Sequence, residues 1–193
     1  KEISKLEELV DLDVSANQLV SLPESLPRLQ NLRRLRASRN RLKKLPRDLS
    51  TMISLWDLRL DYNNLEQLPD SFDGMTELKS LYLDANNLRT LPQSLGKCLE
   101  LRELSVTKNA CAGLVPAVAK LPNLSSFWLS DNCMRNLPKT LGSMVSLTML
   151  DLERNEMEKF VPLDMLKSLE ILKLKRNFIK FIPPEIEKLH NLT

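Results

Sequence analysis

Leucine and other apolar residues recur along the chain at a fixed spacing. The segment Leu9-x-x-Leu12-x-Val14-x-x-Asn17-x-Leu19 returns every 23 residues, except that the seventh unit is one residue shorter. The units begin at residues 9, 32, 55, 78, 101, 124, 147 and 169. The ninth position of every unit is asparagine: Asn17, Asn40, Asn63, Asn86, Asn109, Asn132, Asn155 and Asn177. Self-similarity with this period indicates a stack of equivalent structural units.

The spacing within each unit predicts a strand, a turn and a return segment. The fourth and sixth positions, such as Leu58 and Leu60, are apolar and two residues apart, which places both side chains on one face of a short strand. Asparagine at the ninth position tolerates turn geometry, and its amide can satisfy backbone groups that stacking would bury. The next apolar residues are spaced by three or four, which is helical. Proline, well suited to the first position of such a turn, precedes this spacing at Pro23, Pro46, Pro69, Pro92, Pro138 and Pro183.

The pattern Leu-x-x-Leu-x-Leu-x-x-Asn-x-Leu resembles that of the leucine-rich-repeat family. The ending Leu-Pro-x-x-Leu-x-x-Leu is similar to the intracellular subclass found in Ras-group and PDZ-linked scaffold proteins, and the resemblance covers residues 3–193. It implies an α/β-type solenoid, a curved right-handed superhelix with a parallel β-sheet on its concave face and short 3₁₀ or helical returns on its convex face. Because one unit cannot bury its leucines alone, the units are expected to share one continuous core.

Two units and both ends depart from the regular pattern. Leu114-Val115-Pro116 and Phe160-Val161-Pro162 each shift the proline by one position. This shift predicts a local change in stacking or curvature, or reflects drift in a tolerant loop. The segment around Ile3 and Leu6 fits the close of a preceding unit, and Leu192 opens another. A single domain over residues 1–193 is therefore expected to be part of a longer chain or to fray at its ends, since solenoid ends need polar caps.

Composition places the chain among soluble globular proteins. Charged residues make up 27% and hydrophobic residues 42% of the 193 residues, and no run of about 18 apolar residues could span a membrane. Three cysteines form an odd, sparse set that is typical of a reducing, cytoplasmic setting. Cys98 and Cys111 occupy leucine-like positions and are predicted in the core, whereas Cys133, which lies beside Asn132, is predicted to be partly exposed.

Sequence patterns that carry catalytic or metal chemistry are absent. His190 is the single histidine, so a multi-histidine metal site is excluded, and neither a P-loop nor a G-x-G-x-x-G segment occurs. Asp61 and Asp84 are paired acids on neighbouring strands, but a regular open sheet is expected to offer no desolvated pocket that would shift their pKa values. No catalytic, cofactor-binding or metal-binding residue is predicted, and the chain is not expected to be an enzyme.

Aromatic residues gather on the predicted concave face. The second, third, fifth, seventh and eighth positions of the units should form this face, and all four tryptophans and tyrosines fall on it: Trp56, Tyr62, Tyr82 and Trp128. Aromatic rings with a polar atom are enriched at binding hot spots. A role in binding is favoured over the alternative that these rings only cover sheet area between long neighbours.

Charge alternates sharply between two neighbouring units. Residues 32–54 carry eight basic residues and one acidic residue, a net charge of +7, whereas residues 55–77 carry six acidic residues and one basic residue, a net charge of −5. Arg34 is expected between Asp11 and Asp57 on adjacent strands, and Arg36 beside Asp13, in exposed pairs of small energetic value. The surplus of basic groups could steer an acidic partner.

The predicted contact patch combines these charges and rings: Arg34, Arg36, Arg39, Arg59, Tyr62, Tyr82, Asp84 and Trp128. Its arginines would pair with carboxylates or phosphates, and Tyr82 and Trp128 would supply apolar anchors. None of these side chains is predicted inside, so the joint change Arg36→Glu, Arg59→Glu and Tyr82→Ala should leave the fold intact.

Three functions compete at this point. The leading hypothesis is a protein-interaction module whose concave face binds a folded partner or an extended peptide with an acidic patch. The family resemblance implies partners such as small GTPases, phosphatases or scaffold proteins without choosing among them. The second hypothesis is the targeting arm of a larger kinase, phosphatase or ubiquitin ligase. The third is binding of nucleic acid or anionic lipid through the basic ridge Arg33–Arg47, disfavoured because the ridge is one unit wide and flanked by acidic residues.

Overall fold

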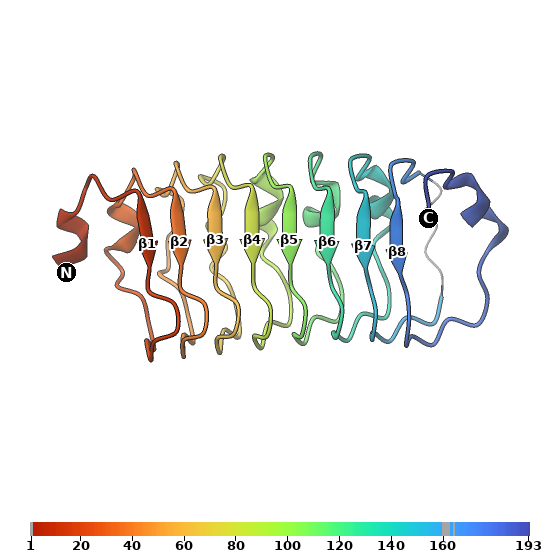
Figure 1. The fold of residues 1–193 in the computed structure, drawn as a ribbon, viewed down its shortest axis with the longest axis horizontal. Coiled ribbons are helices and arrows are strands. Elements are labelled where there is room, and N and C mark those ends of the chain that lie inside the picture. Colours follow the sequence, from red (N-terminus) through yellow and green to blue (C-terminus); the bar gives the residue numbers. More distant parts are fainter. Residues whose placement is uncertain (1, 160–162, 164) are drawn as a thin grey trace.

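The computed structural model describes residues 2–159, 163 and 165–193 and forms a curved solenoid. Its strands form one parallel sheet in the order of the sequence, so that each strand pairs with the strands of the preceding and following repeats (Figure 1). The strands among the described residues are β1 (Asp11–Asp13), β2 (Arg34–Arg36), β3 (Asp57–Arg59), β4 (Ser80–Tyr82), β5 (Glu103–Ser105), β6 (Ser126–Trp128), β7 (Met149–Asp151) and β8 (Ile171–Lys173). Each covers the third to fifth positions of a repeat.

The register of the sheet aligns equivalent positions of successive repeats. Leu58 on β3, for example, pairs with Leu35 on one side and with Leu81 on the other. The leucines of the fourth and sixth positions point beneath the sheet, where Leu58 and Leu60 are buried in a core that runs along the chain. The predicted inward orientation of the leucines is confirmed.

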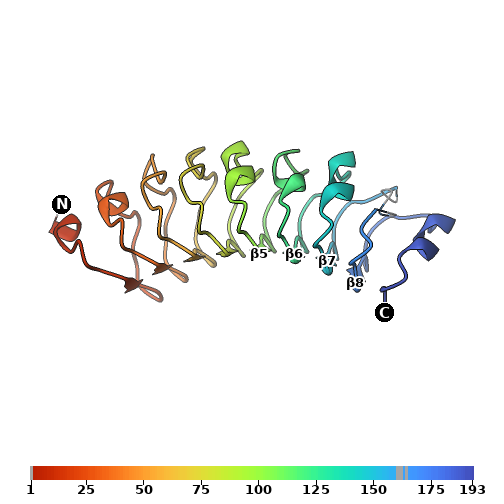
Figure 2. The same ribbon diagram turned by 90° about the horizontal axis from the view of Figure 1, so that it is seen from above.

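The returns lie on the opposite side of the solenoid from the sheet, and the strands line the inner side of a shallow arc (Figure 2). The described 3₁₀ helices are η1 (Glu2–Lys5), η2 (Leu26–Arg28), η3 (Gln93–Lys97), η4 (Val118–Lys120), η5 (Lys139–Ser143) and η6 (Pro184–Lys188). The predicted solenoid with a parallel concave sheet and short convex returns is thereby confirmed.

Turns alone form the returns between β2 and β4, where a 3₁₀ helix was expected. Here the hydroxyl oxygens of Ser71 and Ser94 accept hydrogen bonds from the backbone amides of Leu49 (2.9 Å) and Phe72 (3.0 Å) in the preceding repeat. Such side-chain partners offer the backbone an alternative to the internal hydrogen bonds of a helix.

A ladder of asparagine side chains connects the repeats at the end of each strand. In Asn63, Nδ2 donates to the carbonyl oxygens of Leu60 (2.9 Å) and Ala37 (3.0 Å), while Oδ1 accepts from the backbone amide of Leu42 (3.0 Å). Backbone groups of the preceding repeat thereby find partners in the interior, as predicted. The residue before each asparagine is left-handed, with φ between 51° and 59°, at Ala16, Arg39, Tyr62, Ala85, Lys108, Asp131, Arg154 and Arg176.

The cysteines and the irregular repeats complete the fold. Cys98 and Cys111 are buried, and Cys133 is partly exposed, as predicted. Burial raises the pKa of both buried thiols to about 12. At the first shifted proline, strand pairing between β5 and β6 continues without a break, while the second, at Phe160-Val161-Pro162, lies outside the described residues. No helix in the described part of the chain is long and apolar enough to cross a membrane.

Candidate binding surface

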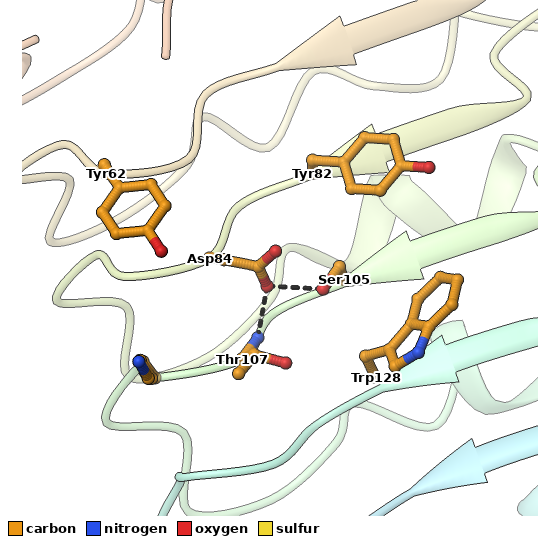
Figure 3. Close-up of a pocket in the computed structure, with 7 residues that line it drawn as sticks. Tyr62, Tyr82, Asp84, Ser105, Thr107 and Trp128 are labelled. Carbon is orange, nitrogen blue, oxygen red and sulfur yellow. Dashed lines mark hydrogen bonds between the residues drawn. The ribbon is translucent and has the colours of Figure 1, made fainter. Parts of the chain in front are cut away.

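A pocket opens on the concave face where a small side chain lies between two aromatic ones. Tyr82, Ser105 and Trp128 occupy the fifth position of three successive repeats, and Ser105 pairs in register with both rings. Strands are spaced by about 4.8 Å, so the two rings stand roughly 10 Å apart across the serine. The resulting pocket of about 360 Å³ is lined by Tyr62, Tyr82, Asp84, Ser105, Thr107, Lys108 and Trp128 (Figure 3).

Asp84 follows β4 and reaches into this pocket. Its Oδ1 accepts hydrogen bonds from the hydroxyl of Ser105 at 2.5 Å and from the backbone amide of Thr107 at 2.7 Å (Figure 3). Burial raises the pKa of Asp84 above its ordinary value, and the nearby carboxylate of Asp61 acts in the same direction, although the two hydrogen bonds oppose the shift. The expectation that the open sheet leaves this carboxylate undisturbed is wrong, because Asp84 lies in a pocket with aromatic side chains from three repeats.

Tyr82 is held in place from two directions. Its hydroxyl donates a short hydrogen bond to Oε2 of Glu103, and the guanidinium of Arg59 lies 4.9 Å from the centre of its ring. Burial, followed by the hydrogen bond to Glu103, raises the pKa of Tyr82 to about 12. Arg39 lies over the ring of Tyr62 at the same distance of 4.9 Å. Cation–π contacts therefore extend the aromatic surface toward β2 and β3.

The arginines beside the pocket make ion pairs that differ from the predicted ones. Arg36 reaches Asp11 and Asp57, each at 3.6 Å, rather than Asp13, which instead accepts a hydrogen bond from the amide of Ser15 at 2.9 Å. The long side chain of Arg36 therefore contacts carboxylates at the third position of the neighbouring repeats, and not the carboxylate of Asp13, which lies directly beside it at the fifth position.

Arg34 lies between Asp11 and Asp57 in the register of the sheet, as predicted. It pairs with Asp11 at 2.6 Å, and no ion pair between it and Asp57 occurs among the described residues. Asp57 is itself buried, contrary to the prediction of exposed pairs, and is paired with Arg36 and Arg59. Part of the basic surplus thus neutralises the protein's own carboxylates.

The structure brings the predicted patch together as one surface of three parts. Tyr62, Tyr82, Asp84 and Trp128 line the pocket. Two further arginines lie over the tyrosine rings, and the other two form ion pairs on β2. The sequence interpretation missed Ser105, Thr107 and Lys108 as lining residues. Reading the fifth position across repeats, where one serine separates two aromatic residues, would have located the hollow.

The chain belongs to the leucine-rich-repeat family, because the family described as leucine-rich repeat region matches residues 1–177. No curated protein matches it. A leucine-rich-repeat protein of Leptospira interrogans is similar in structure, with 31% identity and a TM-score of 0.95 over 100% of this chain and 49% of that one.

Two plant receptors are also similar. The plant peptide hormone receptor RGFR1, solved in complex with RGF2, has 26% identity and a TM-score of 0.85 over 100% of this chain and 32% of that one. The ectodomain of the membrane receptor kinase GASSHO1/SCHENGEN3 from Arabidopsis thaliana, solved with Casparian strip integrity factor 2, has 30% identity and a TM-score of 0.88 over 98% and 24%. The chain thus spans between about half and a quarter of these proteins, whose shared fold is generally a module that binds proteins or other ligands.

Proposed function

We propose that the chain is a protein-interaction module that binds an extended peptide segment of a partner protein on its concave face, and that it is not a catalyst. The observation that carries this proposal is the pocket whose walls are the rings of Tyr62, Tyr82 and Trp128. Aromatic residues of this kind anchor interfaces, since they bury a large area while their polar atoms keep hydrogen bonds. The volume of about 360 Å³ suits one side chain of a partner.

The charges around the pocket favour a partner that also carries acidic groups. Arg39 is exposed, contacts the ring of Tyr62, and forms no ion pair among the described residues. A carboxylate of the partner could therefore pair with its guanidinium without competing with an internal acid. In contrast, Arg34, Arg36 and Arg59 already have carboxylate partners.

We extend the proposal to the intracellular subclass of the family, resembling Ras-group and PDZ-linked scaffolds, and to a cytoplasmic location. Its support is the Leu-Pro-x-x-Leu ending of the repeats and the three free thiols, Cys98, Cys111 and Cys133. In such a scaffold, the concave face would select the partner. Imaging the protein in its host with a fused fluorescent tag tests the location, and a secreted or surface signal would contradict it.

A peptide-display experiment tests the binding function. Peptides selected on the wild-type protein should bind the Trp128→Ala variant at least about tenfold more weakly, as expected for an interface anchor. Trp56→Ala is the matched control, because Trp56 is an exposed tryptophan directly before β3 that does not line the pocket. Selection of no peptides, or of peptides that bind Trp128→Ala as tightly as wild type, would overturn the proposal.

The ion pairs of Asp57 determine which variants can test binding separately from folding. Arg36 and Arg59 neutralise the buried Asp57, so replacing them with glutamate would disturb folding as well as binding. The predicted triple change is therefore replaced by the single change Trp128→Ala.

A further inference from the structure

On two neighbouring repeats of the concave face, Asp57 is buried and Asp84 is partly buried, and among the described residues only Asp57 has a basic side chain within ion-pair distance. Asp57 has Arg59 at 3.1 Å and Arg36 at 3.6 Å. Asp84 has no basic side chain within ion-pair distance among the described residues, although it lines a pocket. Removing a carboxylate from water without a nearby cation is energetically costly. A cation from a ligand would therefore stabilise the ionised form of Asp84.

One oxygen of Asp84 is available to a ligand. Oδ1 accepts both hydrogen bonds, from Ser105 and Thr107, and these fix the orientation of the carboxylate (Figure 3). The hydrogen-bond distances to this carboxylate among the described residues fall on Oδ1, and the side chain of Thr107 also lies close enough to act on the carboxylate. The site therefore presents an oriented, unpaired anionic oxygen.

The walls around this oxygen also favour a cation. The faces of tyrosine and tryptophan rings attract ammonium and guanidinium groups. Arginines of this chain already occupy a face of Tyr62 and of Tyr82, and among the described contacts Trp128 is the ring of the pocket without a cation. The carboxylate of Asp61 lies close enough to act on Asp84 and adds to the negative potential. The positive charge of Lys108 opposes this negative potential, but the side chain is exposed, so solvent screens its charge.

We infer that the pocket receives one basic side chain of the bound peptide, lysine or arginine, with Asp84 as its counter-ion. The inference rests on the proposed peptide-binding function and names the residue that the partner contributes. The alkyl portion of that side chain packs against Trp128 and the tyrosine rings, and its charged end reaches Oδ2 of Asp84. The partner segment then pairs a basic residue in the pocket with an acidic residue opposite Arg39.

Titration with single amino-acid derivatives tests the pocket directly. In a Trp56→Phe background, Trp128 is the remaining tryptophan, so its fluorescence reports on the pocket. N-acetyl-lysine and N-acetyl-arginine N-methylamides should change this fluorescence saturably in the millimolar range. The norleucine derivative, which has no charge, should bind at least about tenfold more weakly, since a charge-assisted contact is lost.

Asp84→Asn is the decisive variant. It keeps an oxygen acceptor for Ser105 and Thr107 while removing the charge, and should weaken binding of the lysine derivative about tenfold. Glu153→Gln is the matched control: it removes the same charge at the same repeat position three repeats away, outside the pocket, and should change affinity by no more than about twofold. Circular dichroism establishes that both variants fold.

Three results would overturn the inference: no saturable response to either basic derivative, equal affinity for the norleucine derivative, or unchanged affinity in Asp84→Asn. The peptide selection separates this failure from that of the proposed function. Selected peptides that depend on Trp128 but contain no common basic residue would leave peptide binding in place and remove the role of Asp84. If the basic derivatives bind but no peptide is selected, the role of Asp84 stands and the proposed peptide-binding function is removed.

Discussion

Arg59 lies against Asp57 on the same strand, and its Nε donates to both oxygens of that carboxylate, at 3.1 and 3.3 Å. The side chain of Asp57 is only 2% exposed, and Arg36 from β2 approaches it at 3.6 Å. Two arginines on adjacent strands thus neutralise one buried acid. The basic residues of this surface therefore contribute to folding.

Replacing Arg59 should separate these two roles. Arg59→Ala is expected to lower the free energy of unfolding by about 1–3 kcal/mol, because it leaves a buried carboxylate with one distant partner. Arg59→Glu should be more destabilising, since it adds a like charge. Arg39→Ala is the matched control, because the guanidinium of Arg39 contacts the ring of Tyr62 and forms no ion pair among the described residues. It should change the free energy of unfolding by no more than about 0.5 kcal/mol. Equal urea unfolding midpoints for Arg59→Ala and Arg39→Ala would contradict this assignment.

The asparagine ladder predicts a second difference in stability. Asn86 is buried, donates to the carbonyl oxygens of Leu60 (3.0 Å) and Leu83 (2.9 Å), and accepts from the amide of Leu65 (2.9 Å). Asn86→Ala leaves these groups unpaired in the interior and should cost at least about 2 kcal/mol. Asn17→Ala should cost less than about 1 kcal/mol, because that exposed side chain only caps its own turn. Denaturant titration of both variants measures the difference, and a similar loss in each would refute the role of the ladder.

The fold was predictable because one period governs the whole chain. Once leucines such as Leu58 and Leu60 are assigned inward, the register of all strands follows, and so does the face on which Tyr82 and Trp128 appear. The role of asparagine also followed from chemistry, since an amide that both donates and accepts is what a stacked turn needs.

The details of the binding surface were less predictable, because they depend on side-chain reach rather than on period. Arg36 has carboxylates on both neighbouring strands, and only packing decides that it contacts Asp11 and Asp57 rather than Asp13. The desolvation of Asp84 depends on how side chains from several repeats pack around it, and its hydrogen bonds to Ser105 and Thr107 hold it in the pocket. Neither effect is visible within one repeat taken alone.

The convex side offers a test of how closely the returns pack. A Cβ atom added at Gly74 would lie 1.8 Å from the carbonyl oxygen of Ser50 in the preceding repeat, whereas one added at Gly113 would meet nothing within 4 Å. Gly74→Ala should therefore lower the free energy of unfolding by about 1–3 kcal/mol through overpacking. Gly113→Ala is the same change without a neighbour and should fall within about 0.5 kcal/mol of wild type. Thermal unfolding of the pair decides the matter, and an unaffected Gly74→Ala protein would mean that the two returns are not in contact.

The pH dependence of Tyr82 reports on its burial and on its bond to Glu103. Because Tyr62 and Tyr82 are the only tyrosines, the Tyr62→Phe variant isolates Tyr82, whose ultraviolet absorbance should titrate with a pKa of about 12 instead of the ordinary 10.0. The folded state holds this proton more tightly than the unfolded state. The stability that Tyr82 contributes is therefore fully present below pH 10.0 and is lost as the pH rises through about 12.

Glu103→Gln should lower the pKa of Tyr82 part of the way toward 10.0, because it removes the anionic acceptor that opposes ionisation, while burial, the larger cause, remains. Glu170→Gln changes the same charge at an exposed position near β8 and should leave the titration in place. If Tyr82 titrated at the ordinary value in the folded protein, its ring would not be enclosed by the neighbouring repeats, and the wall that it gives to the pocket would be lost with it.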